Sequence, residues 1–311
     1  MEELKFEHIP VMLNECIEGL SIKPSGTYVD GTLGGGGHSS HILKRLSDGK
    51  LIGIDKDDYA LSYCKSKFSG QGNVIFAKSD FVDMDKVLAE LGISGVDGIL
   101  LDLGVSSYQI DTAERGFSYR FDAPLDMRMD QTQTLTAYDV VNRYGEEELK
   151  TILYKYGEEE HAKLIVRGIL NARAKAPICT TLQLVQIIEG AIPRKFWGKG
   201  SVAKKTFQAI RIEVNGELEN LERAIRNGVQ LLNRGGRFVV ITFHSLEDRI
   251  VKNVFKECAT GCVCDKSLPV CVCGHKASVK LITKKPLVAS AEELAVNKRS
   301  SSAKVRIVEK L

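Results

Sequence analysis

The chain has 311 residues, of which 43% are hydrophobic, enough for the core of one large domain with an insertion or of two domains. Its first residues are acidic and lack the apolar core of a signal peptide. No apolar run reaches membrane-spanning length, so we expect a cytoplasmic protein without a membrane segment. Eight cysteines without secretory features indicate reduced thiols and exclude a disulfide scaffold.

The net charge of +3 is small, but the charges are unevenly distributed. Residues 101–160 hold thirteen acids and six bases, whereas 191–212 hold six bases and no acid. Residues 249–311 hold thirteen bases and five acids. Basic segments of this kind favour a polyanionic partner, although lysines that only keep the surface soluble give the same pattern.

The first third of the chain alternates between predicted strands and helices. In order, we expect a helix over 13–20, a strand at 28–29, a helix over 38–46, and strands at 50–55, 73–77 and 96–103. This alternation predicts an α/β fold with an open, doubly wound, Rossmann-like sheet. Such sheets bind ligands at the carboxyl ends of their strands.

Four consecutive glycines follow the first strand, within the sequence Asp-Gly-Thr-Leu-Gly-Gly-Gly-Gly-His-Ser of residues 30–39. Glycine is needed where the backbone takes a positive φ or approaches a ligand closely. The dinucleotide fingerprint does not fit, because Ser39 stands where it requires a third glycine. Asp30, Thr32, Gly34 and Gly36 instead resemble the S-adenosylmethionine-binding turn of class I methyltransferases.

Asp55 ends the second strand about 20 residues after the glycines, where a carboxylate accepts hydrogen bonds from ribose hydroxyls. This acid favours a cofactor-binding turn over a ligand-free one. Asp57 or Asp58 is interpreted as the cap of the next helix. Phe81 follows the third strand, where an adenine-binding edge is expected.

The alternation stops after Ser107, and helices dominate the next hundred residues. We therefore predict a helical substrate-recognition domain at 109–203, inserted into a methyltransferase domain formed by 1–108 and 204–311. The helices expected in the insertion are 136–141, 146–156, 158–172 and 180–188. The elements expected after it are a helix over 207–232, a turn at 233–236, a strand at 237–243, a helix over 245–256, and an antiparallel hairpin of 278–283 with 304–309.

Asp102 lies at the tip of the fourth strand, where amino-group methyltransferases carry an acid or amide, two prolines and an aromatic residue. Only the acid is present here, so a role as a cap or loop anchor stays open. Four aromatic residues beyond the strand either stack on a base or pack in the core: Tyr108, Phe117, Tyr119 and Phe121.

Other charged groups have structural interpretations. We expect an Asp–Arg pair within 244–249 to fasten a helix to the sheet, and Asp126 to form an ion pair with Arg128. Four residues just after the predicted insertion are candidates for contact with RNA phosphates: Lys204, Lys205, Gln208 and Arg211.

Longer motifs point to one family. They are His8-x-Pro10-Val11, the glycine turn, and the segments 102–107, 109–111, 115–118, 124–129, 156–159, 206–211 and 243–252. Through them the chain, from His8 to Arg306, resembles the bacterial ribosomal small-subunit (16S) RNA cytosine-N4 methyltransferase family. The resemblance implies a Rossmann-like methyltransferase domain, an inserted helical domain and S-adenosyl-L-methionine as cofactor. It also implies that the substrate is a cytidine of small-subunit ribosomal RNA, free or in a ribosomal particle.

The resemblance further implies a set of residues that touch the cofactor: Gly36, Gly37, His38, Asp55, Phe81, Asp102 and Gln109. Asp102 is also the candidate catalytic residue, because an acceptor on the amine hydrogens favours the geometry that N4 needs for attack. A paired base cannot present N4 in this way, so the substrate must be unstacked or flipped. Residues 201–205 and Ser301 depart from the family pattern, which weakens the contacts expected there.

Two other functions stay open. One is a methyltransferase for DNA or a small molecule. The other is an RNA-binding assembly factor that binds the cofactor without turnover, which the missing proline–aromatic element favours. No metal is assigned to the active site, but four thiols around Pro269 form a weak C-x-C motif for a tetrahedral zinc ion: Cys262, Cys264, Cys271 and Cys273.

Overall fold

The structure is a computed structural model that describes residues 9–198, 200–262, 264, 270 and 272–311. His8, in one predicted motif, and Cys271, a candidate zinc ligand, lie outside the described residues. The chain divides into two compact units, Met1–Gly104 with Leu218–Leu311, and Val105–Glu217. In the ranges described, no helix is long and apolar enough to cross a membrane.

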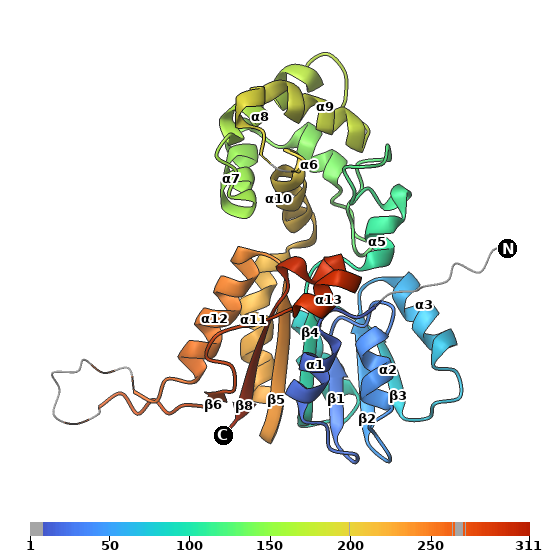
Figure 1. The fold of residues 1–311 in the computed structure, drawn as a ribbon, viewed down its shortest axis with the longest axis vertical. Coiled ribbons are helices and arrows are strands. Elements are labelled where there is room, and N and C mark those ends of the chain that lie inside the picture. Colours follow the sequence, from blue (N-terminus) through green and yellow to red (C-terminus); the bar gives the residue numbers. More distant parts are fainter. Residues whose placement is uncertain (1–8, 199, 263, 265–269, 271) are drawn as a thin grey trace. The chain divides into compact units, whose positions relative to one another are not determined.

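The first unit is built on an eight-stranded sheet in the order β3-β2-β1-β4-β5-β8-β6, with β7 paired to β8 (Figure 1). Its strands are β1 Thr27–Asp30, β2 Lys50–Asp55, β3 Val74–Lys78, β4 Val96–Asp102, β5 Leu232–Thr242, β6 Val279–Leu281, β7 Leu287–Val288 and β8 Lys304–Lys310. Strands β1 to β5 pair in parallel, whereas β8 is antiparallel to its three neighbours. This is the open class I methyltransferase sheet that the sequence predicted, with the closing antiparallel pair formed by β6 and β8.

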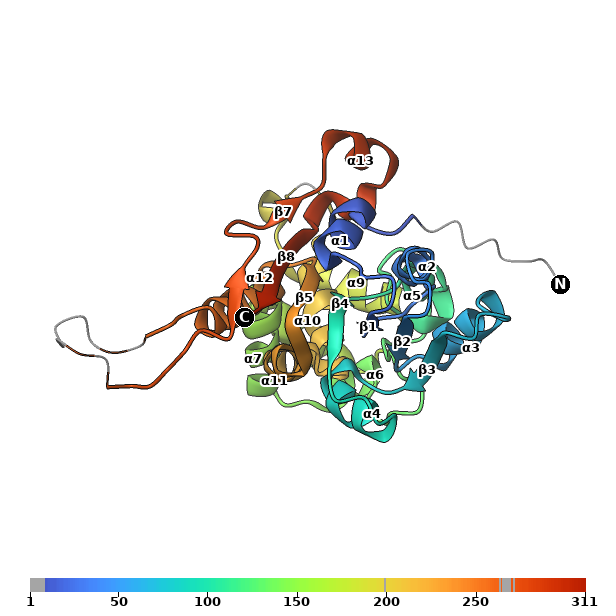
Figure 2. The ribbon, with the colours of Figure 1, turned by 90° about the horizontal axis from the view of Figure 1, so that it is seen from below.

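Helices cover both faces of this sheet. They are α1 Leu13–Leu20, α2 Gly37–Leu43, α3 Asp58–Lys67, η1 Phe81–Asp83, α4 Met84–Glu90, α11 Glu217–Leu231, α12 Ser245–Cys258, α13 Ala291–Val296 and η4 Lys298–Ser302. Buried side chains of α1, α2 and α3 form one core cluster, and those of α4, α11 and α12 form the other. Figure 2 shows α1 and α2 on one side of the central strands and α4 and α11 on the other.

Strand residues alternate between the two cores. On β1, Tyr28 belongs to the core cluster that contains α1, and Val29 belongs to the cluster that contains α4. On β4, Leu100 belongs to the first cluster and Ile99 to the second. All four side chains are fully buried. A strand that is apolar on both faces belongs in the middle of a parallel sheet, which is how β1 and β4 are placed.

The second unit is helical. Its elements are α5 Ser107–Asp111, η2 Ala113–Arg115, α6 Ala137–Arg143, α7 Glu146–Gly157, α8 Ala162–Arg173, α9 Thr181–Ala191, η3 Arg194–Phe196 and α10 Lys204–Asn215. Capping boxes begin α5, α6 and α9, where Ser106, Thr136 and Thr180 accept from the N–H groups of Gln109, Asp139 and Gln183. The helix predicted over 158–172 starts later, since Glu158 is left-handed and ends α7.

The prediction of a single helix over 207–232 is wrong, because two helices occupy this range. Gly216, at φ 60°, ends α10 in the left-handed conformation, and α11 begins at the next residue. Helix α10 packs on α7 and α6 and lies in the helical unit, whereas the sequence boundary at 203 assigned it to the sheet domain. The turn predicted at 233–236 is also absorbed into β5, with Gly235 at φ 77°.

Candidate active site

The glycine turn joins β1 to α2, and two of its glycines are left-handed. Gly34 has φ 48° and Gly36 has φ 64°, a conformation that side chains disfavour. A Cβ on Gly36 would also lie 2.8 Å from the ring of Phe68, and one on Gly37 would lie 2.6 Å from Pro10. Backbone conformation and close packing therefore both require glycine here.

Asp55, at the end of β2, holds this turn in position. One carboxylate oxygen accepts a hydrogen bond from the N–H of Gly34 at 2.8 Å, and the other accepts from the N–H of Asp57 at 2.9 Å. Burial raises the pKa of Asp55 to about 6. A carboxylate offers about four acceptor positions, so Asp55 both fixes the turn and retains capacity for a ligand hydroxyl.

Two side chains of α3 also contact the turn, and the sequence did not reveal them. The thiol of Cys64 donates to the carbonyl of Gly34 at 3.3 Å. The ammonium of Lys67 donates to the carbonyls of Gly35 and Gly36 at 2.7 and 3.2 Å. Because the partners are about 30 positions apart in the chain, no local pattern signals these contacts.

Asp102 lies at the carboxyl end of β4, beside the glycine turn. Its N–H donates to Oγ1 of Thr32 at 2.6 Å, which ties β4 to the turn. Its Oδ2 lies 3.7 Å from Nδ1 of His38, whose Nε2 is 3.1 Å from the carbonyl oxygen of Val11. The other oxygen, Oδ1, is buried and has no hydrogen-bond partner within the described part of the chain. A buried acceptor without a donor is unfavourable, so this atom is suited to a ligand N–H.

The acids at this edge of the sheet hold their protons unusually tightly. Asp30 accepts from the hydroxyl of Ser39 at 2.6 Å, and its burial raises its pKa to about 6. The pKa of Asp102 is raised to about 8, first by burial and then by the charges of Asp30 and Glu247. Clustered acids with raised pKa values are typical of functional sites.

Phe81 begins η1, directly after β3, and packs partly against the core. A Cβ on Gly31 would lie 3.2 Å from Cβ of Phe81, so the base of this side chain lies next to the start of the glycine turn. Asp80 caps η1 through the N–H of Val82 at 3.1 Å and pairs with Lys56 at 3.2 Å. Six of the seven predicted cofactor residues are thus brought to one edge of the sheet unit.

The seventh, Gln109, lies in the helical unit and caps α5. Ser106 Oγ accepts from the N–H of Gln109 at 3.2 Å, and Oε1 of Gln109 accepts from the N–H of Ser106 at 3.1 Å. This capping box is a structural role that the sequence analysis missed, although Ser106 followed three residues later by Gln109 is its usual signature. Contact between Gln109 and a cofactor stays a prediction.

The Asp–Arg pair expected within 244–249 instead joins Asp248 to an arginine outside that segment. The carboxylate of Asp248 binds Arg306 at 2.6 and 3.2 Å, which fastens α12 to β8. His244 is the N-cap of α12, and the carboxylate of Glu247 accepts from the N–H of Phe243 at 2.8 Å. These contacts give the charged residues that follow β5 a structural role.

The ion pair predicted in the helical unit is confirmed. Arg128 Nε lies 3.1 Å from both oxygens of Asp126, and a terminal nitrogen lies 2.6 Å from Oδ2. The other terminal nitrogen donates to the carbonyls of Gln131 and Gln133 at 3.0 and 2.8 Å. Arg128 therefore shapes the loop after η2.

Three of the four candidates for RNA contact make hydrogen bonds inside the helical unit, since the ammonium of Lys205 donates to the carbonyl of Glu158 at 2.9 Å. Gln208 donates to a backbone carbonyl of α7 at 3.0 Å, and Arg211 makes two bonds of 2.9 Å to the carboxylate of Glu217. Glu217 therefore balances the charge of Arg211. Lys204 and Lys205 are exposed at the start of α10.

The aromatic residues proposed for stacking differ in exposure. Phe117 is buried, and Tyr119 packs edge-on against Phe207 with ring centres 5.9 Å apart. Phe121 is 47% exposed, which makes it the better placed of these three rings for contact with a base.

An open sheet with this strand order, a glycine turn after β1 and acids ending β2 and β4 define a class I methyltransferase fold. The chain belongs to the MraW methylase family, whose model matches residues 5–311.

The chain is similar to named relatives over almost its entire length. A ribosomal RNA small subunit methyltransferase H from Clostridium botulinum (strain Kyoto / Type A2) is 55% identical over 309 residues, 99% of this chain and 100% of that protein. A protein of the same name from Finegoldia magna is 52% identical over 311 residues, with the same coverage. An rRNA methylase structure from Streptococcus thermophilus has 11% identity and a TM-score of 0.42, over 96% of this chain and 93% of that chain. Family membership does not rest on that structural likeness.

Proposed function

We propose that this protein transfers the methyl group of S-adenosyl-L-methionine to the exocyclic N4 amine of a cytidine in small-subunit (16S) ribosomal RNA. The observation that carries the proposal is the buried Oδ1 of Asp102, which lacks a donor among the described residues. Membership of a methylase family supports methyl transfer. The names of the relatives support small-subunit ribosomal RNA as the substrate.

The edge of the sheet has the chemistry that this cofactor needs. When bound, the cofactor supplies a methyl group activated by a positively charged sulfur. Asp55 retains acceptor positions for ribose hydroxyls, and Gly36 and Gly37 leave the turn without side chains. His38 and Phe81 flank the turn, and Gln109 is the proposed contribution of the helical unit.

Asp102 supplies the acceptor that the amine requires. The lone pair of cytosine N4 is delocalised into the ring, so the nitrogen attacks poorly while it stays planar. A hydrogen bond from N4 to Oδ1 favours a pyramidal nitrogen whose lone pair faces the methyl carbon. The N–C bond forms as the C–S bond breaks, and the nitrogen then releases one proton. Only the ionised carboxylate of Asp102 accepts that proton, and because its pKa is raised to about 8, this form becomes the major one above about pH 8.

A segment of the helical unit is suited to unpaired RNA. Phe196 and Trp197 are 51% and 38% exposed. The ammonium of Lys195 lies 4.9 Å from the centre of the Phe196 ring, and Cζ of Arg194 lies 6.0 Å from that of Trp197. Aromatic faces stack on unpaired bases while the neighbouring cations neutralise phosphates. The segment 194–197 thus favours RNA over a small molecule as the substrate.

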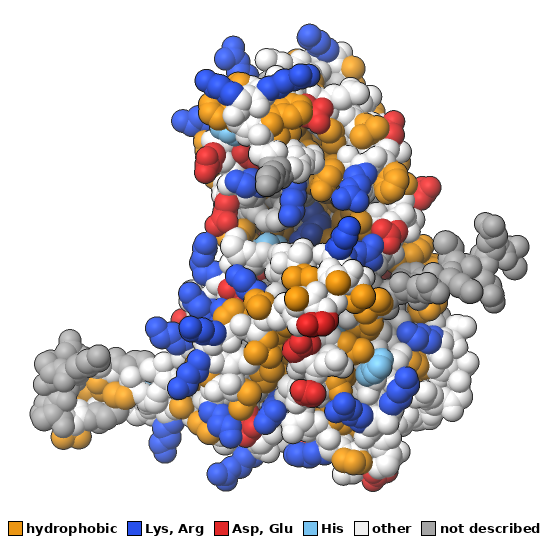
Figure 3. Space-filling model, in the orientation of Figure 1, with side chains coloured by type: hydrophobic (Ala, Val, Ile, Leu, Met, Phe, Trp, Pro, Cys, Tyr) orange, Lys and Arg blue, Asp and Glu red, His pale blue; other side chains and the backbone are white. Residues whose placement is uncertain are grey.

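The sheet unit is basic along one side. Lys and Arg side chains gather on the side that carries α12 (Figure 3), as the thirteen bases and five acids of residues 249–311 lead one to expect. A basic surface attracts a polyanion and speeds its association at low salt.

Methyl incorporation tests the proposal. The full chain is incubated with labelled S-adenosyl-L-methionine and, separately, assembled small subunits, naked ribosomal RNA, DNA and free cytidine. The product nucleosides are then identified by mass spectrometry. We expect N4-methylcytidine in small-subunit RNA, free or assembled. Label in DNA or free cytidine alone would indicate another methyltransferase, and binding of cofactor and RNA without label would indicate an assembly factor.

A further inference from the structure

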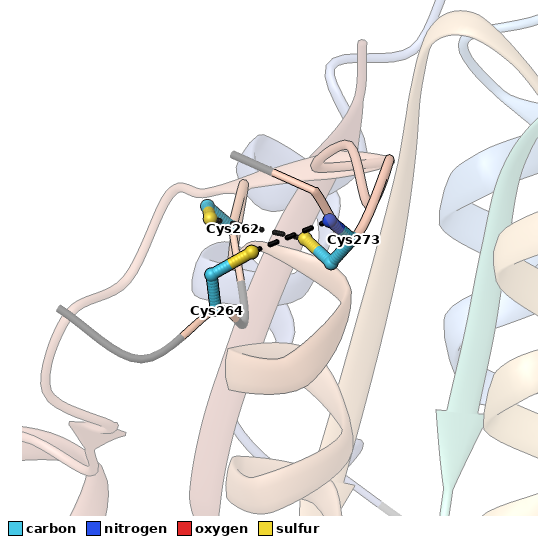
Figure 4. A group of neighbouring side chains, drawn as sticks. All are labelled: Cys262, Cys264 and Cys273. Carbon is cyan, nitrogen blue, oxygen red and sulfur yellow. Dashed lines mark hydrogen bonds between the residues drawn. The ribbon is translucent and has the colours of Figure 1, made fainter. Parts of the chain in front are cut away.

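Three thiols come together in the segment that joins α12 to β6. The sulfur of Cys262 lies 3.8 Å from that of Cys273, and the sulfurs of Cys262, Cys264 and Cys273 all lie within 4.8 Å of one another (Figure 4). The segment runs from Cys258, the last residue of α12, to Val279, the first of β6. It contains none of the residues proposed for methyl transfer.

The sulfur separation fits a shared metal ion and not a disulfide. A disulfide bond is about 2.05 Å long, whereas Cys262 and Cys273 hold their sulfurs 3.8 Å apart. Zinc–thiolate bonds of about 2.3 Å at tetrahedral angles place two sulfurs about 3.8 Å apart. The sulfurs of Cys262 and Cys273 are thus spaced as two ligands of a tetrahedral zinc ion require.

Two backbone N–H groups of the second half of the segment contact the sulfur of Cys264. The N–H groups of Val272 and Cys273 both donate to Sγ of Cys264, each at 3.3 Å (Figure 4 marks the bond from Cys273). The second half of the segment therefore wraps around a sulfur of the first half.

Hydrophobic packing does not account for this arrangement. Val270 and Val272 are 70% and 77% exposed, so the apolar side chains next to the thiols contribute little to a core. Short segments with too small a core are commonly held together by a metal or a disulfide. The sulfur spacing favours the metal.

We propose that Cys262, Cys264 and Cys273 bind a zinc ion that holds together the segment between α12 and β6. Thiolate ligands select zinc over magnesium or calcium. Each coordinating thiol releases its proton as it binds. Sequence spacing offers Cys271 as a fourth thiol, but it lies outside the described residues, and the proposal rests on the other three.

The proposed zinc site has a structural role, because α12 separates it from the candidate active site. This helix begins beside the carboxyl end of β5, the edge of the sheet at which Asp102 ends β4, and it leads away to Cys258. The thiols follow the far end of the helix. Loss of the metal should therefore affect this segment and leave the cofactor site intact.

Metal analysis of the full chain tests the inference. Protein purified from zinc-supplemented cells without chelator should contain one zinc ion per chain. Cobalt added to the chelated protein should give thiolate-to-metal charge-transfer absorption. Cys264→Ser should lower zinc affinity at least about tenfold, a loss typical of altered metal sites, measured by competition with a chelating dye. Cys179→Ser, which removes an exposed thiol of the helical unit, should keep the zinc affinity of the wild type.

Several outcomes would overturn the inference. Wild-type protein that contains no zinc, and that shows no charge-transfer absorption with cobalt, would overturn it. Equal zinc affinity in the Cys264 and Cys179 variants would also overturn it. A Cys262–Cys273 disulfide found by mass spectrometry of freshly purified protein would also contradict it. Cofactor affinity reports folding: Cys264→Ser should bind S-adenosyl-L-methionine as the wild type does. If that variant does not fold, the wild-type metal content and cobalt titration still decide.

Discussion

At the scale of single residues, the candidate active site contains buried acids whose pKa values are raised. The pKa values of Asp30 and Asp55 are raised to about 6 and that of Asp102 to about 8, mainly by burial. Each folded acid binds its proton more tightly than the unfolded chain does. The stability this contributes is complete below about pH 4 and is lost as the pH rises through the folded pKa.

Asp102→Asn separates the contribution of Asp102 from those of the other two acids. The amide is neutral at every pH, so the variant escapes the penalty of ionising a buried carboxyl. Its free energy of unfolding relative to the wild type should increase by at least about 1 kcal/mol from pH 5 to pH 8.5, since one pKa unit corresponds to about 1.4 kcal/mol. Urea unfolding at the two pH values measures this, and a pH-independent difference would show that Asp102 ionises normally.

Thr32 is a second residue whose role the structure defines. Its hydroxyl accepts the N–H of Asp102 at 2.6 Å, so Thr32→Val should leave a partly buried donor without its partner. We expect Thr32→Val to lose about 1–3 kcal/mol of stability. Thr32→Ser keeps the hydroxyl and should lose less than about 1 kcal/mol. Equal unfolding midpoints for the two variants would mean that the hydrogen bond contributes nothing.

At the scale of elements, the glycine turn combines a left-handed backbone with close packing. Gly36→Ala meets both obstacles, and we expect it to destabilise the protein by about 1–3 kcal/mol and to weaken cofactor binding. Gly190→Ala is the control, because Gly190 lies in α9 with open space around it and should gain up to about 1 kcal/mol. Thermal unfolding and calorimetry measure both effects. A Gly36 variant as stable as the wild type would refute this account of the turn.

The elements that the sequence predicted well are those with strong local patterns. Apolar runs such as β2 and β4, bounded by glycines and acids, identify buried strands without any knowledge of their neighbours. The break at Gly216 escaped prediction because helical periodicity continues across it, and glycine also occurs inside helices. The start of β5 was missed because Asn233 to Gly236 has turn composition.

At the scale of the whole molecule, the proposed RNA contacts lie on the segment 194–197 of the helical unit. Replacing Phe196 and Trp197 by alanine should weaken binding by about 1–3 kcal/mol for each base that stacks, with little change in salt dependence. Replacing Arg194 and Lys195 should instead lower the log–log salt slope by about 1.4 for single-stranded RNA. Tyr154→Ala, another exposed aromatic, is the control. Equal effects of all three variants would argue against a stacking surface.

Most of the site at the sheet edge could be predicted, because its residues end strands or follow glycines. Asp55 and Asp102 were placed by strand position, and the turn was placed by its composition. The contacts of Lys67 with Gly35, and of Thr32 with Asp102, could not be predicted, since they join segments that only the folded sheet brings together. The cap formed by Gln109 was missed because family resemblance suggested a ligand role for the same side chain.

The measurement that tests the central claim most directly is single-turnover methyl transfer by Asp102→Asn, with wild type as reference and cofactor and RNA binding measured alongside. The amide keeps the shape of the carboxyl but replaces one acceptor oxygen with a donor. Loss of a transition-state hydrogen bond of this kind slows the chemical step by about 100-fold or more. We predict such a loss in transfer to cytidine N4, with RNA affinity unchanged. A variant that methylates small-subunit RNA at the wild-type rate would contradict the role of Asp102.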